Sequence, residues 1–432
     1  MVWCFSGSPG AWEEAELWVN LSFRMNQREI LERGKKKVSW VRAHMPLLAY
    51  IEEEFAREKP LSGVRIAVSV HLEAKTARLA LALAAGGAEV AVTGSNPLST
   101  QDDVVEALKD EGLSVYAKHG VSEEQYWKDL KRTLAIKPHL VLDDGGDLTA
   151  LLHNECAAWG NETVGICEET TTGVVRLQKL TANGRLRYPA VAVNDAKMKY
   201  LFDNRYGTGQ STWDAIMRAT NLLVAGKVVL VVGYGWCGRG IALRARGLGA
   251  RVVVSEVDPI RAAEALMDGF SVAPLREAIR EADFLVTATG CIDAVPYEAL
   301  LEAKDGLVLA NAGHFDVEID VRTLRDRARS RHVRDNVEEF TLPNGKKVYL
   351  LAQGRLVNLA AGDGHPAEIM DISFALQALS LRWLLEHGGE LRPGVYPVPR
   401  EIDEGVARRF LEANGVRIDS LTEEQKRYLG LS

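Results

Sequence analysis

The chain has 432 residues, 47% of them hydrophobic, which is enough for two or three domains with cores, and no apolar run approaches the roughly 20 residues of a membrane span. Its net charge of −7 comes from mixed charges without a long single-sign run, which argues against a nucleic-acid partner and favours small-molecule ligands. The 5 cysteines are widely spaced without a CxxC pair, which excludes a disulfide framework and a cysteine-based zinc site and fits a reducing cytoplasm.

The first 24 residues differ in pattern from the rest of the chain. They are rich in tryptophan and have no basic residue before Arg24, which argues against a signal peptide. A regular helical pattern of polar and apolar residues begins only after Met25. We therefore expect translation to start at Met25 and residues 1–24 to be a disordered extension.

From Val64 onward, short β-branched runs alternate with helical stretches, a pattern typical of a mostly parallel sheet with helices on both faces. The early runs end in His71, in Ser95 and Asn96, in Asp143 and Asp144, in Glu168 and Glu169, and in Asn194 and Asp195. Carboxyl ends of parallel strands share one edge of a sheet, so we expect these polar groups to form one site. For any single residue, local capping of a turn is an equally good interpretation.

A second unit begins near Gly207, where helix, strand, glycine turn, helix and strand follow one another. Further strands are expected in "DFLVTATG" and "GLVLANAGH", so the unit resembles a mononucleotide-binding half of a doubly wound sheet. The glycine-rich stretches "NRYGTGQST" and "NLAAGDGHP" border it and are typical of interdomain hinges.

The stretch "VVGYGWCGRG" has the spacing of a dinucleotide-binding turn, with Gly233, Gly235 and Gly238 after a strand and at the start of a helix. Missing Cβ atoms let the backbone approach a pyrophosphate, which then faces the helix N-terminus. Glu256 ends the next strand and is expected to accept hydrogen bonds from ribose hydroxyls, which favours NAD over NADP. Arg261 nearby is able to pair with a phosphate.

Lys199 and Asp203 lie four residues apart, which places them on one face of a helix. A surface ion pair is the common interpretation of such a pair. Its place between the last strand of the first unit and the glycine turn favours a site instead.

Seven motifs in order give the chain a family resemblance, namely "LDDGGDLT", "EETTTG", "KMKYLFDNRYGTGQS", "GYGWCGRG", "GHFDVEID", "GRLVNL" and "DGHP". They resemble those of the S-adenosylhomocysteine hydrolases, from about Val38 to the C-terminus. The resemblance implies tightly held NAD that oxidises the 3′-hydroxyl of the substrate ribose. The 4′-proton then becomes acidic, homocysteine is eliminated, water adds, and the hydride returns, without net redox change.

The resemblance also implies residue roles. Lys199 and Asp203 bond the 3′-hydroxyl, and Lys199 assists its deprotonation, which requires a lowered lysine pKa. Asp144 is the base for the 4′-proton, and His71 lies near the leaving sulfur and the attacking water. The implied substrate-binding set is Glu73, Asp144, Glu169, Lys199, Asp203, His314 and His365. The implied cofactor-binding set is Thr170, Thr171, Thr172, Asn204, Gly233, Gly235, Trp236, Cys237, Gly238, Arg239, Gly240, Glu256, Arg261, Thr289, Asn311, Ala312, Gly313, His314 and Asn358, and no metal is expected.

Two departures from the familiar eukaryotic members bear on substrate and redox behaviour. Glu73 and Lys75 stand near the purine base where those members have threonine and glutamate, a form similar to thermophilic bacterial and archaeal members, some of which act on S-inosylhomocysteine. The base therefore stays open between adenine and hypoxanthine. Thr208 replaces a cysteine linked to redox behaviour.

The expected fold is α/β, with a Rossmann-type NAD-binding domain inserted in a larger parallel-sheet substrate-binding domain. Expected boundaries are 25–206 for the substrate-binding and catalytic domain, 207–362 for the NAD-binding domain, 363–398 for the return to the substrate domain, and 399–432 for a C-terminal oligomerisation segment. The resemblance implies a homotetramer. The expected ligands are S-adenosylhomocysteine, adenosine and homocysteine, with neither nucleic acid nor membrane as a partner.

Two other functions compete with this one. An NAD-dependent dehydrogenase that releases NADH is supported by the glycine turn alone, but not by "KMKYLFDN" or "EETTTG". A noncatalytic NAD-binding regulator would have lost side chains that are all present here.

Overall fold

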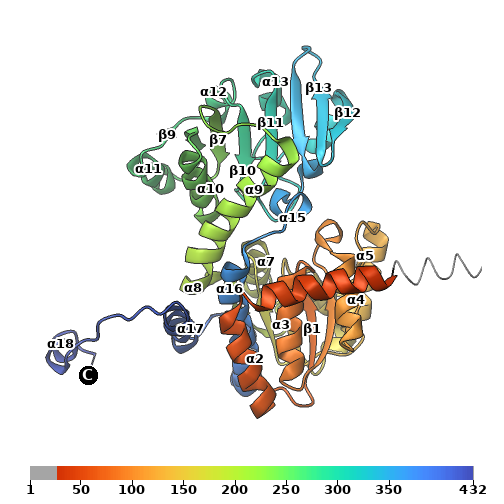
Figure 1. Cartoon of the computed structure of the whole chain (residues 1–432), viewed down its shortest axis with the longest axis vertical. Coiled ribbons are helices and arrows are strands. Elements are labelled where there is room, and N and C mark those ends of the chain that lie inside the picture. Colours follow the sequence, from red (N-terminus) through yellow and green to blue (C-terminus); the bar gives the residue numbers. More distant parts are fainter. Residues whose placement is uncertain (1–26, 432) are drawn as a thin grey trace, which may run out of the picture.

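The computed structural model describes residues 27–431, which fold around two separate sheets (Figure 1). The predicted extension over residues 1–24 lies outside the described residues. The described part opens with a helix over residues 27–42. No helix in this part of the chain is long and apolar enough to cross a membrane.

The first sheet, sheet A, is entirely parallel and has the strand order β15-β6-β5-β4-β1-β2-β3. Its strands are β1 (Arg65–Ser69), β2 (Glu89–Thr93), β3 (Ser114–Val115), β4 (Leu140–Asp143), β5 (Gly165–Glu168), β6 (Pro189–Ala192) and β15 (Gly394–Pro397). Because β15 comes from the far end of the chain, the chain leaves this sheet, builds the other one and returns.

The second sheet, sheet B, has the order β12-β13-β14-β11-β10-β7-β8-β9 and is parallel except around β13. Its strands are β7 (Val228–Val232), β8 (Arg251–Ser255), β9 (Ser271–Val272), β10 (Phe284–Thr287), β11 (Leu307–Asn311), β12 (Arg329–Arg334), β13 (Val337–Thr341) and β14 (Lys347–Leu351). An antiparallel hairpin of β12 and β13 thus extends a doubly wound sheet at its β14 edge.

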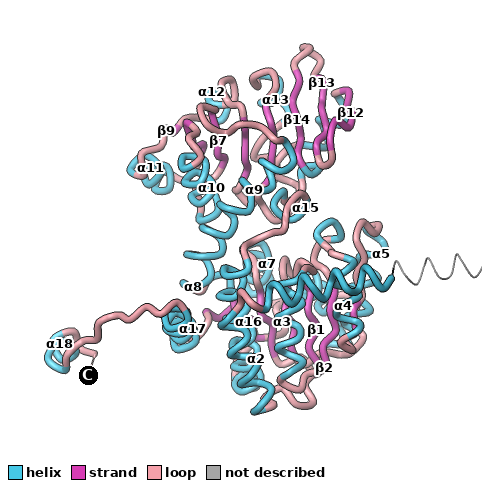
Figure 2. Tube along the Cα trace, in the orientation of Figure 1, coloured by secondary structure: helices cyan, strands magenta, loops and turns pink. Residues whose placement is uncertain are grey.

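Helices cover both faces of each sheet (Figure 2). Around sheet A they are α2 (Pro46–Glu58), α3 (Ala74–Ala85), η1 (Pro97–Ser99), α4 (Asp102–Asp110), α5 (Glu123–Leu134), α6 (Asp147–His153), η2 (Ala157–Gly160), α7 (Thr171–Ala182), η3 (Val193–Asp195), α16 (Ala367–His387), η6 (Gly388–Glu390) and α17 (Arg400–Ala413). Around sheet B they are α10 (Trp236–Gly247), α11 (Pro259–Met267), α12 (Leu275–Ala278), α13 (Tyr297–Glu302), α14 (Val321–Arg327), η5 (Ala352–Gly354) and α15 (Val357–Ala360). Between the sheets run α8 (Lys197–Lys199), the π-helix η4 (Tyr200–Gly207) and α9 (Thr208–Thr220), while α18 (Glu423–Tyr428) stands away from both in Figure 1.

Period-two alternation in the strands builds these layers. In β7, Val229 and Val231 pack with residues of α9 and α10, whereas Leu230 and Val232 pack in a cluster with residues of α13 and α14. In β1, Ile66 joins a core shared with α2, α3 and α16. All four positions of β4, β5, β6 and β10 are buried, as expected of strands covered on both faces.

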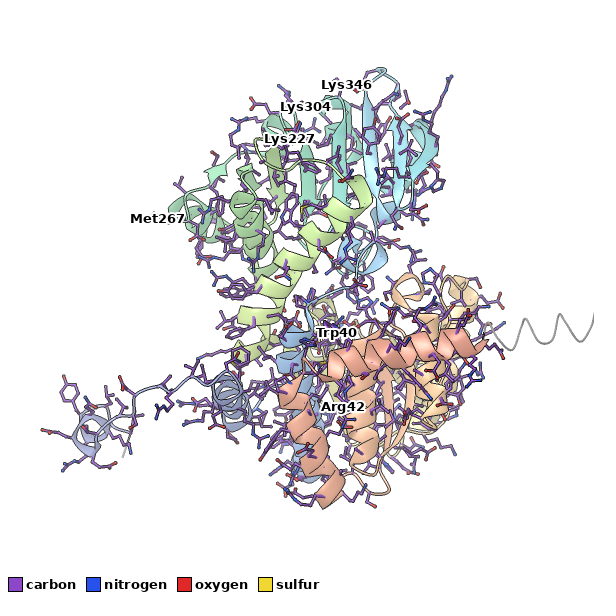
Figure 3. The ribbon with its side chains drawn as sticks, viewed as in Figure 1. Trp40, Arg42, Lys227, Met267, Lys304 and Lys346 are labelled. Atoms are coloured by element: carbon purple, nitrogen blue, oxygen red, sulfur yellow. The ribbon has the colours of Figure 1, made fainter. Side chains whose placement is uncertain are left out.

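The carboxyl ends of the parallel strands in sheet B face the sheet A unit. Figure 3 shows Lys227, Lys304 and Lys346, which come shortly before β7, β11 and β14, on the side of sheet B remote from α16. The strands therefore run toward sheet A. The expected α/β architecture, with the nucleotide-binding unit inserted between parts of the other, is confirmed.

Candidate active site

A cavity of about 390 Å³ lies between the two units and is lined from both. From the sheet A unit it receives His71, Glu73, Asp144, Glu169, Thr170, Thr171, Thr172, Lys199, Asp203, Asn204 and His365. From the sheet B unit it receives Gly235, Trp236, Cys237, Arg261, Thr289, Ala312, Gly313, His314 and Asn358. Most of the side chains predicted from the sequence thus meet in one place.

The strand endings of sheet A divide into three groups. His71, Asp144 and Glu169 line the cavity directly. Ser95 and Asn194 do not line the cavity but bind residues that do. The Ser95 hydroxyl donates to Asp144 Oδ2 at 3.1 Å, and Asn194 Oδ1 accepts from Asn204 at 3.1 Å. The others serve the backbone or local contacts: Asn96 caps η1, Asp195 accepts from Asn194, and Asp143 and Glu168 bind backbone amides.

Lys199 lies in a buried group of acids. Its Nζ is 3.6 Å from Glu169 Oε1, 3.6 Å from Asp203 Oδ1 and 2.9 Å from Asn204 Oδ1. Asp203 and Asn204 lie on the π-helix η4, a rare geometry that often occurs at functional sites. The expected pair of Lys199 and Asp203 is therefore a buried one, where an ammonium is far less screened than at the surface.

The charge of Lys199 corrects one expectation. Burial acts to lower the pKa of Lys199, but the carboxylates of Asp203 and Glu169 outweigh burial and leave that pKa above its usual value. The predicted lowering is therefore wrong for this arrangement, since sequence spacing shows one of the acids but not the second. Lys199 is a cation here.

Asp203 is held by two residues distant in sequence. His365 Nδ1 is 2.7 Å from Asp203 Oδ1, and the Ser373 hydroxyl donates to Oδ2 at 2.6 Å. Burial acts to raise the pKa of Asp203, but the Lys199 ammonium and His365 outweigh it and hold that pKa below its usual value. Asp203 is thus a fixed carboxylate.

Glu169 is the acid of this group that titrates near neutrality. Burial raises the pKa of Glu169 to about 7, against the opposing effect of the Lys199 ammonium. Gln377 donates to Glu169 Oε2 at 2.5 Å, while Oε1, which faces Lys199, has no hydrogen-bond partner in the described part of the chain. Glu169 can therefore exchange a proton with a ligand, while Lys199 keeps its own.

Asp144 is flanked by two histidines. His71 Nε2 lies 3.5 Å from Asp144 Oδ2, and His314 Nδ1 lies 3.8 Å from Oδ1. Burial lowers the pKa of His71 to about 4, which the Asp144 carboxylate opposes only in part, so the ring is neutral at pH 7. Ligand atoms of these three residues lie within 4.8 Å of one another, a spacing that also suits a metal ion.

The tautomer of His71 follows from Ser99. The Ser99 hydroxyl donates to the Asn96 carbonyl at 2.9 Å, so its oxygen accepts from His71 Nδ1 at 2.7 Å. Nε2 then carries the free electron pair and faces Asp144 and the cavity. His71 can accept a proton there.

Glu73 and Lys75 form a buried ion pair of 2.7 Å in the cavity wall. Glu73 also caps α3 by accepting from the Lys75 backbone amide, and Lys75 Nζ donates to the Asp363 carbonyl at 2.9 Å. Two charged groups thus present one acceptor and one donor side by side.

Comparison with known proteins agrees with this geometry. Residues 22–162 match the family model of S-adenosyl-L-homocysteine hydrolase, and residues 204–364 match its NAD-binding domain. An adenosylhomocysteinase of Thermotoga maritima is 60% identical over 92% of this chain and 99% of its own length. The chain belongs to the S-adenosyl-L-homocysteine hydrolase family.

Other relatives carry two different names. An adenosylhomocysteinase of Pyrococcus abyssi is 57% identical over 92% of this chain and 94% of its own length. An S-inosyl-L-homocysteine hydrolase of Methanopyrus kandleri is 53% identical over 94% of this chain and 96% of its own length. The family resemblance seen in the sequence is confirmed. The two names differ in the purine base of the substrate, which is adenine for one and hypoxanthine for the other.

The glycine turn fits the NAD that the family's second domain binds. Gly233 has φ of +94°, and a Cβ on Gly238 would lie 1.9 Å from the Gly233 carbonyl oxygen, so the turn tolerates no side chain at either place. Gly235 lines the cavity and has only the Arg261 guanidinium near its Cβ position, at 3.7 Å. This leaves room beside the N-terminus of α10 for a pyrophosphate.

Six predicted cofactor residues do not line the cavity. They are Gly233, Gly238, Arg239, Gly240, Glu256 and Asn311. Arg239 binds Asp268 instead, with Nη2 to Oδ2 at 2.8 Å, and a Cβ on Gly240 would collide with the Arg205 carbonyl, so this glycine serves helix packing. Glu256 accepts backbone amides of Tyr234 at 2.7 Å, Val257 at 2.6 Å and Asp258 at 3.0 Å, and about one of the four acceptor sites of its carboxylate is left for a ribose.

The loops of sheet B are held from behind by two buried polar residues. Asn311 is fully buried and donates to the carbonyls of Gly313, Phe315 and Gly354, so it supports the cofactor loop without lining the cavity. Glu318 accepts from the amides of Thr289 and Gly290 at 2.8 Å each. Only Asn311 was predicted from the sequence.

Sequence reasoning missed the contribution of α16. Ser373 and Gln377 hold the two central acids, and Met370 and Phe374 line the cavity. The available signal was the i, i+4 spacing of Ser373 and Gln377 among the polar residues of a mostly apolar, buried helix.

Proposed function

We propose that this chain catalyses the reversible hydrolysis of S-adenosyl-L-homocysteine to adenosine and L-homocysteine, through NAD-dependent oxidation at C3′, elimination, water addition and re-reduction. The observation that carries the proposal is the buried group of Lys199, Asp203 and Glu169, which shares one cavity with the glycine turn and with Asp144 and His71. A simple dehydrogenase has no need for this second set of acids and bases.

Thr170–Thr172 and Asn204 on the sheet A side, with Asn358 and the turn at Gly235 on the sheet B side, would hold NAD, which when bound would accept a hydride from C3′ and give it back. These residues are proposed to hold it by backbone amides and short polar side chains. The role of Arg261 is a minor one because its side chain is 53% exposed.

Lys199 acts on the 3′-hydroxyl together with Glu169. Since Lys199 is a cation in this arrangement, it must first lose a proton, and the unpartnered Glu169 Oε1 at 3.6 Å is placed to accept it. The pKa of Glu169, about 7, lies below the raised pKa of Lys199, so this transfer is uphill and the ammonium is the resting form. The neutral amine then accepts the hydroxyl proton while Asp203 holds the amine in place. A coupled pair of lysine and glutamate thus takes the place of a lone lysine base.

Asp144 is proposed to remove the 4′-proton, which becomes acidic once a ketone stands beside it. Ser95 and His314 orient its carboxylate. His71, neutral and with Nε2 free to accept, activates the water that adds after the thiol has left. The 4′-proton and a proton of the attacking water are thus each assigned to one of these residues.

We propose adenine as the base and hypoxanthine as the second candidate. The ion pair of Glu73 and Lys75 complements the edge of either base. An adenine edge offers its amino group to Glu73 and N1 to Lys75. A hypoxanthine edge offers N1–H to Glu73 and O6 to Lys75.

The remaining assignments are also proposals. The domain boundaries at 206/207, 362/363 and 398/399 rest on the glycine-rich stretches and on the return of the chain to sheet A at β15. A homotetramer built through residues 399–432 is supported by the position of α18 away from both sheets. The cytoplasm is proposed from the cysteine content, since Cys156, Cys167, Cys237 and Cys291 are unpaired thiols.

Purified protein loaded with NAD, given S-adenosylhomocysteine and a thiol reagent, tests the function while absorbance reports NADH. Homocysteine release without matching NADH supports the proposal. Accumulating free NADH would support the dehydrogenase, and NAD binding without turnover would support the regulator. A parallel reaction with S-inosylhomocysteine decides the base by the ratio of the two kcat/KM values.

A further inference from the structure

Two buried acids stand directly behind the acids of the active site. Asp143 ends β4 and precedes Asp144, and Glu168 ends β5 and precedes Glu169. The two are paired in register across neighbouring parallel strands, and both are fully buried. Side chains at paired positions project to the same face, so the two carboxyl groups are neighbours.

One oxygen of each acid holds a loop that carries active-site residues. Asp143 Oδ2 accepts from the amide and the hydroxyl of Thr149, both at 2.8 Å, which fixes the first turn of α6. Glu168 Oε1 accepts from the amide of Gly145 at 2.9 Å and from the amide of Thr170 at 3.0 Å. Glu168 therefore joins the loop after Asp144 to the loop after Glu169.

The other oxygen of each acid has no partner among the described residues. Asp143 Oδ1 and Glu168 Oε2 are both buried without a hydrogen bond. A buried acceptor without a donor costs free energy, and two neighbouring buried carboxylates repel each other. One proton between these two oxygens removes both penalties.

The backbone of α7 packs tightly against the Glu168 carboxyl group. A Cβ on Gly173, in the first turn of this helix, would lie 2.0 Å from the Glu168 carboxyl carbon, which leaves little room there for a further donor. Burial raises the pKa of Asp143 to about 7 and raises the pKa of Glu168 well above its usual value, the Asp143 charge adding to the latter. Both effects keep a proton on the pair at neutral pH.

We propose that Asp143 and Glu168 share one proton and act as positioning residues, which lock together the loops that carry Asp144 and Glu169. The value of this lock for the reaction rests on the proposed function, whereas the shared proton does not. Loss of the lock moves the base and the acid of the site relative to each other. Catalysis is sensitive to such small displacements.

Amide replacements separate a shared proton from two independent acids. In Glu168→Gln the amide oxygen still accepts from Gly145 and Thr170, and the amide N–H takes the place of the shared proton toward Asp143. Asp143→Asn works in the same way from the other side. In the double variant two NH2 groups face each other, and no acceptor remains for either.

We expect the effect of each replacement on kcat to depend strongly on whether the other replacement is present. Each single variant lowers kcat by less than about threefold, whereas the double variant lowers kcat by about tenfold or more beyond the product of the singles. KM changes less than kcat, because the substrate contacts themselves are intact. Glu111→Gln, an exposed acid at the end of α4, is the matched control.

Infrared spectroscopy of the folded protein at neutral pH gives a readout that needs no activity and no double variant. Glu169, with a pKa of about 7, contributes a C=O stretch of its own that both variants keep, so the readout is the difference spectrum of wild type minus variant. That difference is expected to contain a further C=O stretch of a protonated carboxylic acid, lost in Glu168→Gln and in Asp143→Asn alike. Absence of this difference band in both variants, additive losses of kcat, or a double variant more active than the singles would overturn the proposal. If wild type shows the band but no hydrolysis of S-adenosylhomocysteine, the proposed function fails and the shared proton stands.

Discussion

The carboxyl edges of the two sheets face one cavity but contribute to it differently. Sheet A ends in charged and titratable side chains, of which His71, Asp144 and Glu169 line the cavity. Sheet B ends in a glycine turn and in the loop of Ala312 and Gly313, and its buried polar residues point back to hold these loops. In the proposed function, sheet A supplies proton transfer, and sheet B supplies room, backbone amides and the His314 side chain beside Asp144.

This difference teaches how a cofactor fingerprint is to be read. A glycine turn indicates which cofactor is bound, because its chemistry is that of the backbone. It says little about the reaction, because the proposed function assigns the reacting protons to residues of the sheet A unit. Variants on the two sides should therefore fail in different ways.

The largest effect is expected from Lys199→Met on the sheet A side. The variant removes the group proposed to act on the 3′-hydroxyl and should lower kcat by at least about 10², the lower range for acid and base groups. NAD content of the purified variant should match wild type. Lys179→Met, an exposed lysine of α7, is the control, and near-normal turnover of Lys199→Met would remove Lys199 from its role.

Gly238→Ala tests the sheet B side. The added Cβ would lie 1.9 Å from the Gly233 carbonyl oxygen, so the turn must shift, and we expect NAD content to fall by about tenfold or more. Excess NAD in the assay should restore part of the activity. Gly247→Ala, in the same helix with open space at its Cβ, should behave as wild type. Full NAD occupancy in Gly238→Ala would contradict the assignment.

On the sheet A side, His71 should make the free energy of unfolding depend on pH. Its pKa is about 4 in the folded chain and about 6.5 when unfolded, so between these values only the unfolded chain gains a proton and stability is lost as pH falls. Over this range wild type should lose about 3 kcal/mol more free energy of unfolding than His71→Gln.

Denaturant unfolding at several pH values and constant NAD concentration measures this difference. His332→Gln, on the exposed strand β12, serves as the control and should follow wild type at every pH. Parallel curves for wild type and His71→Gln would show that the ring is not buried in its neutral form.

The smallest effect is expected from Arg261→Gln. Its side chain is 53% exposed and lies 3.8 Å from Asp258, so its charge is well screened. The affinity for NAD should fall by less than about threefold. Titration of the cofactor-free protein with NAD measures it, and a loss comparable with that of Gly238→Ala would show that side-chain charge, rather than the backbone, holds the pyrophosphate.

Much of the fold was predictable because its signals are local. The apolar runs of β4 and β7 and the spacing of Gly233, Gly235 and Gly238 lie within a few residues of one another. The convergence of His71, Asp144 and Glu169 followed from a general property of parallel sheets. Asn96 and Asp195 show the limit of that reasoning, since both serve only local contacts.

The rest of the site depends on contacts that spacing along the chain does not show. Ser373 and Gln377 reach Asp203 and Glu169 from 170 and 208 residues away, and Glu169 adds its charge to that of Asp203 in raising the pKa of Lys199. Arg239 and Glu256 match the cofactor motif by position, and the structure adds partners that the motif does not show, namely Asp268 for Arg239 and backbone amides for Glu256. Motif position indicates a neighbourhood, whereas hydrogen-bond partners decide what each side chain does.

The central claim is that the two edges cooperate so that a hydride leaves the ribose and comes back. The direct measurement is the fate of deuterium placed at C3′ of S-adenosylhomocysteine and followed through a complete turnover. Adenosine that keeps the deuterium at C3′, formed together with homocysteine, is the predicted result. Deuterium released into free NADH, or homocysteine formed without any slowing by the C3′ label and with label lost from adenosine, would contradict the claim.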